Sequence, residues 1–305
     1  MKTIILILFS IMTLFSCSDA SLRSRKNANR EQYPPSKMFK GDALSAAQKM
    51  YDGDIAEMER EIKQNNLNLN KLDDSTGYTL LMYATIIEDM RAMEKLLSLG
   101  ADPTIIIPDG GLANPLNHAV ALNNYKMMDL LFKYKANPNP KIGRSPLINA
   151  MLVGGFKNTE KKLIDYLLAH GADINNISLN GDNIMEAVTR DDLDMALYFL
   201  EKGGQPVIEG TTLCPVAKYI QFEEQNQKKF KNEETPYFKK LMTFKQKLIE
   251  KYNVKFPYEK DTMEEARLRI KLYEHLSPQD KISINFKKNY GEKWYQKDLE
   301  LVEGK

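Results

Sequence analysis

A sequence pattern that recurs at a fixed interval is the feature that most constrains how this chain can fold. Each copy reads as a turn, a short helix, a second helix and a glycine-ended exit, as in the blocks at 143–150 and 167–175. An alanine in the first helix and a turn residue at the exit recur about 31 to 36 residues apart: Ala84, Ala119 and Ala150, and Gly100, Lys135 and Gly171. A period of roughly 33 residues is typical of repeats that stack on their neighbours. The sequence therefore predicts an all-α array.

The copies can be followed along most of the chain. A first, degenerate block runs over about 42–70, and its polar outer helix suits a terminal repeat. The later blocks span roughly 73–104, 109–138, 141–174 and 178–205. A sixth begins at Thr211, and apolar residues at helical spacing over 237–252 read as its second helix.

The signature residues of these blocks point to a known family. Two first helices with their turns read Gly77-Tyr-Thr-Leu-Leu-Met-Tyr-Ala84 and Asn114-Pro-Leu-Asn-His-Ala119, and one exit reads Leu167-Leu-Ala-His-Gly-Ala-Asp173. They resemble the ankyrin repeat, with its Thr-Pro-Leu-His turn, alanine, Leu-Leu pair and Gly-Ala-Asp exit. The resemblance implies an ankyrin-repeat solenoid over residues 40–258, built of helix-turn-helix repeats with short β-hairpin loops and capped by extra C-terminal helices.

Some signature residues have a mechanical role. Thr79 and Ser145 can cap first helices through their hydroxyl groups. Gly100 and Gly171 are expected to end second helices in the left-handed conformation. The chain departs from the family pattern at Leu80, where a proline is usual, and each departure weakens a local bond rather than the architecture.

The first residues read as a targeting segment. One cationic residue and a short apolar run precede Cys17, and this run is too short to span a bilayer as a mature helix. Residues 1–16 are therefore predicted to be a signal peptide. The end, Leu14-Phe-Ser-Cys17, resembles a bacterial lipobox, which implies that Cys17 becomes the lipid-carrying N-terminus. Ser18 in place of aspartate favours the outer membrane, periplasmic side. The alternative is an ordinary signal peptide with an incidental cysteine.

Residues 17–39 are rich in polar and basic residues and show no apolar periodicity. Such a stretch cannot bury enough apolar surface to order itself. We therefore expect a flexible tether between the lipid anchor and the repeats. The alternative is an arm, around Tyr33 to Phe39, that packs on the first repeat.

A partner surface follows from the resemblance. Ankyrin partners meet the hairpin tips and the exposed end of each first helix, and many of these normally solvated positions are apolar here. They predict a hydrophobic groove flanked by Tyr78 and Tyr134. The alternative is that they pack on a neighbouring repeat, on the C-terminal segment or on the folded-back linker. The predicted partner-binding residues are Tyr78, Ile86, Ile87, Leu99, Leu122, Tyr134, Ile142, Arg144, Leu152 and Val153.

Charge and residue usage argue against several classes of function. The formal net charge of +2 is too small to indicate nucleic-acid binding. Two cysteines and three scattered histidines supply neither a disulfide framework nor a metal site, so no cofactor or metal is expected. Cys214 is expected to be a buried apolar thiol. No phosphate loop or nucleophile elbow occurs in the sequence.

The C-terminal residues 259–305 depart from the repeat pattern. Thr262-Met-Glu-Glu265 resembles a capping box and predicts a helix to about Leu276. We expect this helix, with the tail docked on it, to cap the array.

The sequence therefore predicts a non-catalytic, monomeric protein-binding module of the bacterial cell envelope. The alternatives are an immunity protein that neutralises a co-encoded toxin and a structural envelope scaffold. An enzyme in the last ~90 residues would need a polar pocket with clustered acids or histidines, which His275 alone does not supply.

Overall fold

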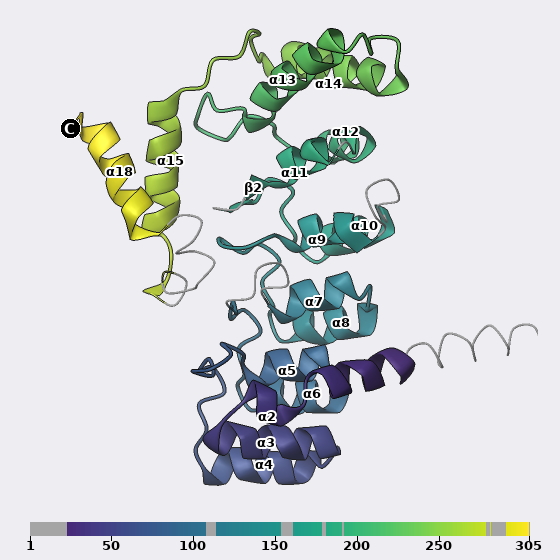
Figure 1. The fold of residues 1–305 in the computed structure, drawn as a ribbon, viewed down its shortest axis with the longest axis vertical. Helices are drawn as coiled ribbons and strands as arrows, with labels where there is room; N and C mark the ends of the chain where they lie inside the picture. Colours follow the sequence, from purple (N-terminus) through teal and green to yellow (C-terminus); the bar gives the residue numbers. More distant parts are fainter. Residues whose placement is uncertain are drawn as a thin grey trace, which may run out of the picture. The chain divides into compact units, whose positions relative to one another are not determined.

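The protein is mostly helical, as predicted, with one two-stranded hairpin in the described part of the chain (Figure 1). A computed structural model describes residues 23–107, 114–153, 161–178, 181–190, 192–278, 281 and 291–304. The chain forms two compact units, Met1–Ile107 and Pro108–Lys305.

The first unit consists of two helix pairs preceded by an N-terminal segment. Residues 23–32 are helical and lead to the short helix α2. The named helices are α2 (Pro35–Met38), α3 (Gly41–Asp52), α4 (Ile55–Gln64), α5 (Leu80–Ile86) and α6 (Met90–Ser98). Helix α3 packs on α4, α5 packs on α6, and the pairs meet through α3 with α5 and α4 with α6.

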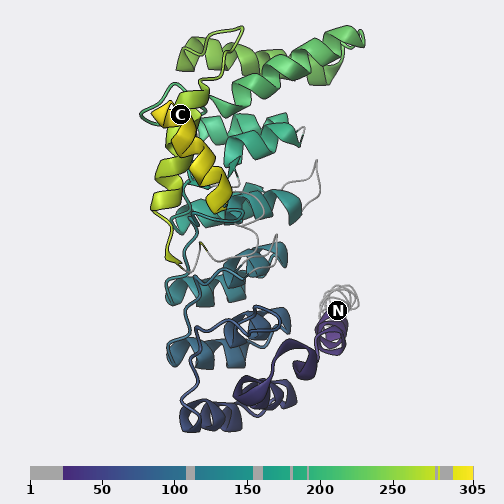
Figure 2. The same ribbon diagram turned by 60° about the vertical axis from the view of Figure 1, so that its left-hand side comes forward.

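The second unit contains further helix pairs and a C-terminal helical hairpin. Its elements are α7 (Pro115–Ala121), α8 (Tyr125–Lys133), α9 (Pro146–Val153), α10 (Lys161–Ala169), β1 (Ile177–Ser178), β2 (Gly181–Asp182), α11 (Asn183–Thr189), α12 (Leu193–Glu201), α13 (Pro215–Lys229), α14 (Pro236–Tyr252), α15 (Thr262–Glu274) and α18 (Glu292–Glu303). The first helices form a row in which α7 packs on α9, α9 on α11 and α11 on α13. Helices α15 and α18 lie against each other (Figure 2).

Side-chain caps begin the helices where the sequence indicated them. The Thr79 hydroxyl accepts a hydrogen bond from the Met82 amide at 3.1 Å, and the Ser145 hydroxyl accepts one from the Ile148 amide at 3.2 Å. Both predicted caps are therefore confirmed. A side-chain cap satisfies one of the amide groups that the first turn of a helix leaves without a partner.

The second helices end through left-handed residues, as predicted for the glycines. Gly100 has a φ of 97° and Gly171 a φ of 86°, a conformation that glycine adopts without steric penalty. Lys135 takes the same place after α8 with a φ of 64°. The turn is therefore set by the position in the repeat even where a side chain makes it less favourable.

An asparagine bridge ties successive helix pairs together within each unit. The Asn139 side chain donates to the Gly171 carbonyl at 2.8 Å and accepts from the Asp173 amide at 2.7 Å. Asn70 and Asn175 make the corresponding pair of bonds to the residues that follow α6 and α12. Each bridge satisfies one carbonyl and one amide at the end of a helix, so it fixes the spacing of neighbouring pairs.

The second helices of the second unit are linked by tyrosine–aspartate hydrogen bonds. The Tyr166 hydroxyl of α10 donates to the Asp129 carboxylate of α8 at 2.5 Å. One pair further along, the Tyr198 hydroxyl of α12 donates to Asp165 of α10. The same chemistry thus recurs at equivalent positions, as a repeating architecture requires.

The C-terminal helix also agrees closely with its prediction. Helix α15 spans Thr262–Glu274, and its N-cap is Asp261, whose carboxylate accepts from the Glu264 amide at 2.9 Å. The predicted capping residue, Thr262, is instead the first helical residue. Cys214 is buried, as expected.

Candidate functional site

The N-terminal arm, residues 23–39, lies on the C-terminal end of α5. The Arg25 guanidinium donates two hydrogen bonds of 2.7 Å to the Glu88 carboxylate. The Asn29 amide donates to the Ile86 carbonyl at 3.0 Å. For residues 23–39 the structure therefore differs from the predicted flexible tether; residues 17–22 lie outside the described part of the chain.

Glu88 occupies an unusual position at the turn between α5 and α6. Its backbone has a φ of 53°, and its side chain is only 1% exposed. Arg25 is 39% exposed, and the hydrogen bond to Glu88 raises the pKa of the guanidinium. A buried carboxylate needs such a partner because its charge is otherwise costly to remove from water.

Two predicted groove residues are covered. Ile86 is 5% exposed and Ile87 is 1% exposed, so neither presents an apolar surface to solvent. Part of the cover comes from the arm: Asn29 bonds the Ile86 carbonyl, and Lys26 and Ile87 line the same crevice. The prediction of an exposed groove is therefore wrong at these two positions, where the folded-back linker supplies part of the cover.

A half-buried apolar patch remains beside the arm. We define the aromatic patch as Tyr33, Leu72 and Tyr78, which pack on a buried cluster beneath them. The buried cluster is Met82, Ile86 and Ile107. The structure thus brings together two predicted site residues, Tyr78 and Ile86, and adds the arm residue Tyr33 to them.

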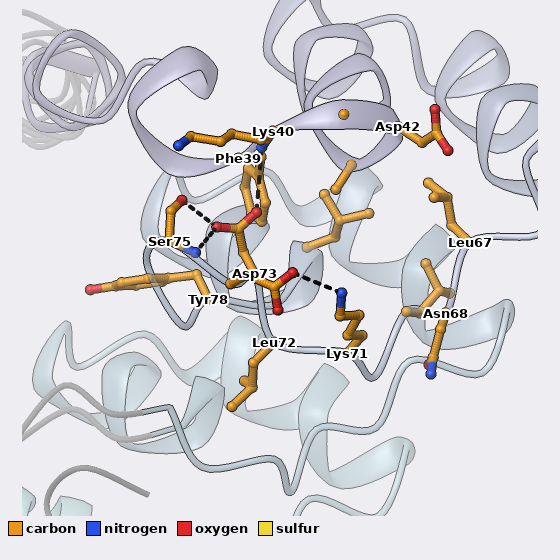
Figure 3. A pocket seen from close by; sticks show the side chains of 15 residues that line it. Phe39, Lys40, Asp42, Leu67, Asn68, Lys71, Leu72, Asp73, Ser75 and Tyr78 are labelled. Atoms are coloured by element: carbon orange, nitrogen blue, oxygen red, sulfur yellow. Dashed lines mark hydrogen bonds and ion pairs between the residues drawn. The ribbon is translucent and has the colours of Figure 1, made fainter.

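A pocket of about 500 Å³ opens next to the patch (Figure 3). Its lining combines apolar side chains with charged groups around the turn that precedes α5. Leu72 and Tyr78 belong to both the pocket and the aromatic patch. Figure 3 shows Asp73 between Lys40 and Ser75, with Tyr78 beside them.

Asp73 organises this turn through its carboxylate. One oxygen accepts from the Ser75 amide at 2.9 Å and from the Thr76 amide at 3.2 Å, and the other accepts from the Lys40 amide at 3.3 Å. Burial raises the pKa of Asp73, but the hydrogen bonds from Ser75, Thr76 and Lys40 outweigh it and leave the pKa lowered. The pocket wall is therefore a preformed, charged turn.

The remaining predicted residues are spread over both units. Ile142 is 2% exposed, so the prediction of an exposed position is wrong there as well; burial removes its branched apolar side chain from water. Leu152 is 36% exposed on α9, in agreement with the prediction of an exposed apolar position. The half-buried residues are Leu99 in the first unit and Leu122, Tyr134, Arg144 and Val153 in the second. Tyr78 and Tyr134, the predicted flanks of one groove, belong to different units.

Sequence reasoning missed the arm residues that complete this site. Arg25, Asn29 and Tyr33 are spaced four residues apart and so share one helix face. Residues 23–33 contain neither glycine nor proline and are rich in good helix formers, which was the available signal. The polar composition hid it because helices are usually recognised by their apolar stripe.

No group of three or more metal-ligating side chains comes together among the described residues. Within that same part of the chain, no helix is long and apolar enough to cross a membrane. The predicted signal peptide and the lipidation site Cys17 lie outside the described residues. A scan against protein-family models matches none of them, and a search of the curated proteins finds no match.

Proposed function

We propose that this protein is an ankyrin-repeat module that binds a protein partner without catalysis. Helix pairs with equivalent caps, left-handed exits and asparagine bridges support this architecture. Within each unit, first helices pack side by side, which is the arrangement that exposes a row of loops to a partner.

The aromatic patch is the observation that carries the binding role. Tyr33, Leu72 and Tyr78 are half-buried, and the pocket beside them has a charged rim. Tyrosine is enriched at protein interfaces because its ring supplies contact area while its hydroxyl remains hydrated. A rigid apolar centre with a polar border is the arrangement that such interfaces use.

A comparison of matched variants tests the binding role. Tyr78→Ala is expected to lower recovery of the partner from envelope extracts at least tenfold, about 1.4 kcal/mol of binding free energy. Phe230→Ala removes an aromatic side chain that is 66% exposed in the other unit, and it should leave recovery unchanged. Circular dichroism checks that both variants fold. Equal recovery with Tyr78→Ala and the unaltered chain would remove the patch from the proposal.

We also propose that the module is held to the bacterial cell envelope by lipid on Cys17, at the periplasmic side of the outer membrane. The support is the sequence Leu14-Phe-Ser-Cys17 after a short apolar run. Several acyl chains on one cysteine would give stable attachment, whereas one chain gives marginal binding.

Labelling with a radioactive fatty acid tests the attachment. Cys17→Ser should lose the label and move the protein from the membrane fraction to the soluble fraction. Cys214→Ser is the matched control because Cys214 is the other cysteine and is buried, so the label should persist. Label that persists in Cys17→Ser would refute lipid attachment at this residue.

A further inference from the structure

We infer that the C-terminal end of α5 is a binding site for a helix, and that the N-terminal arm is its resident, displaceable occupant. A partner would enter this site with a helix that presents arginine, asparagine and an aromatic residue at four-residue spacing. The inference deepens the proposed function and rests on it only for the identity of the second occupant.

The arm engages the site through one face of its helix. Arg25 pairs with Glu88, Asn29 bonds the Ile86 carbonyl, and the Tyr33 carbonyl accepts from the Tyr83 hydroxyl at 3.0 Å. These three contacts lie one helical turn apart, so together they select a helical ligand. The third bond is to the Tyr33 backbone, and the Tyr33 side chain packs separately on Met82, Ile86 and Ile107. Such spacing is how grooves recognise helical ligands in general.

A second face of the arm adds charge complementarity. Arg30 lies 3.7 Å from the Asp89 carboxylate, and its guanidinium sits over the Tyr51 ring at 5.1 Å from the centroid. The site therefore presents two neighbouring carboxylates, Glu88 and Asp89, to a basic helix. An acidic helix would meet repulsion there, which makes the site selective for basic ligands.

Before Pro35, the arm contributes to the core only through the half-buried Tyr33, which packs on Met82, Ile86 and Ile107. No residue from 23 to 34 is buried, and the first buried residue of the arm is Pro35. A crevice of about 390 Å³ remains between the helical segment and the α5–α6 turn, lined by Lys26, Arg30 and Ile87 among others. An element that is held mainly by polar contacts and buries no side chain completely can leave without disturbing the core beneath it.

Displacement of the arm would change the surface that a partner meets. Ile86 and Ile87 lie under the arm, and Ile86 already belongs to the cluster beneath Tyr78. A ligand helix in place of the arm would therefore contact Leu72 and Tyr78 of the aromatic patch together with these isoleucines, and its own aromatic residue would take the place of Tyr33. The same site would then supply the apolar surface that the sequence predicted at Ile86 and Ile87.

The first measurement is hydrogen exchange of the arm amides in the full mature chain. Arg25→Glu places a negative charge against Glu88 and should speed exchange over residues 24–32 at least tenfold. Arg23→Glu makes the same charge change on an exposed residue of the same helix and should change exchange less than twofold. Exchange that stays slow in Arg25→Glu would show that the arm is not displaceable, and the inference would fail.

The second measurement uses a fluorescent synthetic peptide of residues 23–34 as the competing helix. It should bind the Arg25→Glu chain at least tenfold more tightly than the unaltered chain, because the attached arm competes at an effective concentration of millimolar order. A peptide that itself carries Arg25→Glu should not bind either chain. Equal binding of the normal peptide to both chains, or no binding to either, would overturn the inference.

The two proposals can fail separately. If the peptide binds the released chain but no envelope protein is recovered, the helix site stands and the proposed binding role fails. If a partner is recovered equally by the unaltered and Arg25→Glu chains and the peptide does not compete, the partner binds elsewhere and the helix site is refuted.

Discussion

The N-terminal arm and the C-terminal helical hairpin, α15 with α18, each contain an arginine that makes two hydrogen bonds to one carboxylate, but the surroundings of the two ion pairs differ. In the arm, Arg25 makes two bonds of 2.7 Å to the buried Glu88. In the hairpin, Arg269 makes bonds of 2.8 and 2.7 Å to Asp298, which is 5% exposed. The geometry of the ion pair alone therefore does not distinguish a helix that stays docked from one that can be displaced.

The difference lies in what surrounds each pair. The helical segment of the arm buries no side chain, whereas the hairpin buries Ala266, Tyr273 and Leu276. Tyr273 also stacks on Tyr295 of α18 at 4.2 Å between ring centroids. The hairpin ion pair adds to apolar packing that is already favourable, whereas the arm relies mainly on its polar contacts to offset the entropy of ordering a segment.

Replacing the buried residue at the C-terminal end of the arm should have the largest effect on stability. Phe39 is 2% exposed and meets the Tyr83 ring edge-on at 5.4 Å. Phe39→Ala should lower the free energy of unfolding of the first unit by about 3–5 kcal/mol. Tyr33→Ala changes a half-buried residue that precedes Pro35, in the displaceable part of the arm, and it should lower this free energy by about 1 kcal/mol. Urea denaturation, monitored by circular dichroism, measures both losses. Equal losses would mean that Phe39 and Tyr33 contribute alike to the stability of the first unit.

Breaking the hairpin ion pair should come second. Asp298→Asn removes the charge that pairs with Arg269 and should lower the stability of the hairpin by about 1.5–3 kcal/mol. Trp294, the single tryptophan, lies on α18 and reports hairpin opening by fluorescence. Glu300→Gln is the control because Glu300 is exposed on the same helix. An unchanged midpoint in Asp298→Asn would mean that packing alone holds the hairpin.

Acidification should loosen the hairpin by a smaller amount. Burial raises the pKa of Glu265, but hydrogen bonds from Lys260 and Arg269 outweigh this and lower it below its usual 4.5. The carboxylate therefore stabilises the folded state above about pH 4.5, and this contribution is lost as the pH falls through the lowered pKa. The fluorescence of Trp294 in urea should report an earlier transition in acid. Glu265→Gln should remove part of this dependence, and an identical dependence would contradict the assignment.

Added salt should have the smallest effect and should separate the two elements. Raising the ionic strength from about 0.1 to 1 M shortens the screening length from about 10 to 3 Å. Arm amides should then exchange a few-fold faster because Arg25 is 39% exposed. Arg269 is 32% exposed, so salt screens the hairpin pair to a similar degree. The hairpin amides should nevertheless change less, because the packing of buried Ala266 and Tyr273 does not depend on salt. Equal responses would mean that the apolar packing of the hairpin does not protect it when its ion pair is screened.

The helix pairs were predictable because their signals are local. Thr79 lies three residues before the amide that it caps, and Gly100 ends the helix that directly precedes it. Helix α14, Pro236–Tyr252, followed from apolar residues at helical spacing in a single window. Each of these features is decided within a few residues of the chain.

The arm site was not predictable because its contacts are remote in sequence. Arg25 and Glu88 are 63 positions apart, and neither residue by itself indicates a partner. Ile86 and Ile87 follow the repeat pattern as surface positions, yet they are buried, and part of their cover comes from the arm. A repeat pattern describes what each repeat buries against the next, and an added segment lies outside it.

The docked arm also limits how far the module could stand from a bilayer. Under the proposed lipid attachment, Cys17 lies eight positions before Arg25, the residue of the arm that pairs with Glu88. Eight residues reach at most roughly 29 Å when fully extended. The first unit would therefore stay close to the lipid headgroups, and release of the arm would increase the distance that it can reach from them. Whether the arm occupies the α5 site would then determine how far from the membrane the repeats can bind a partner.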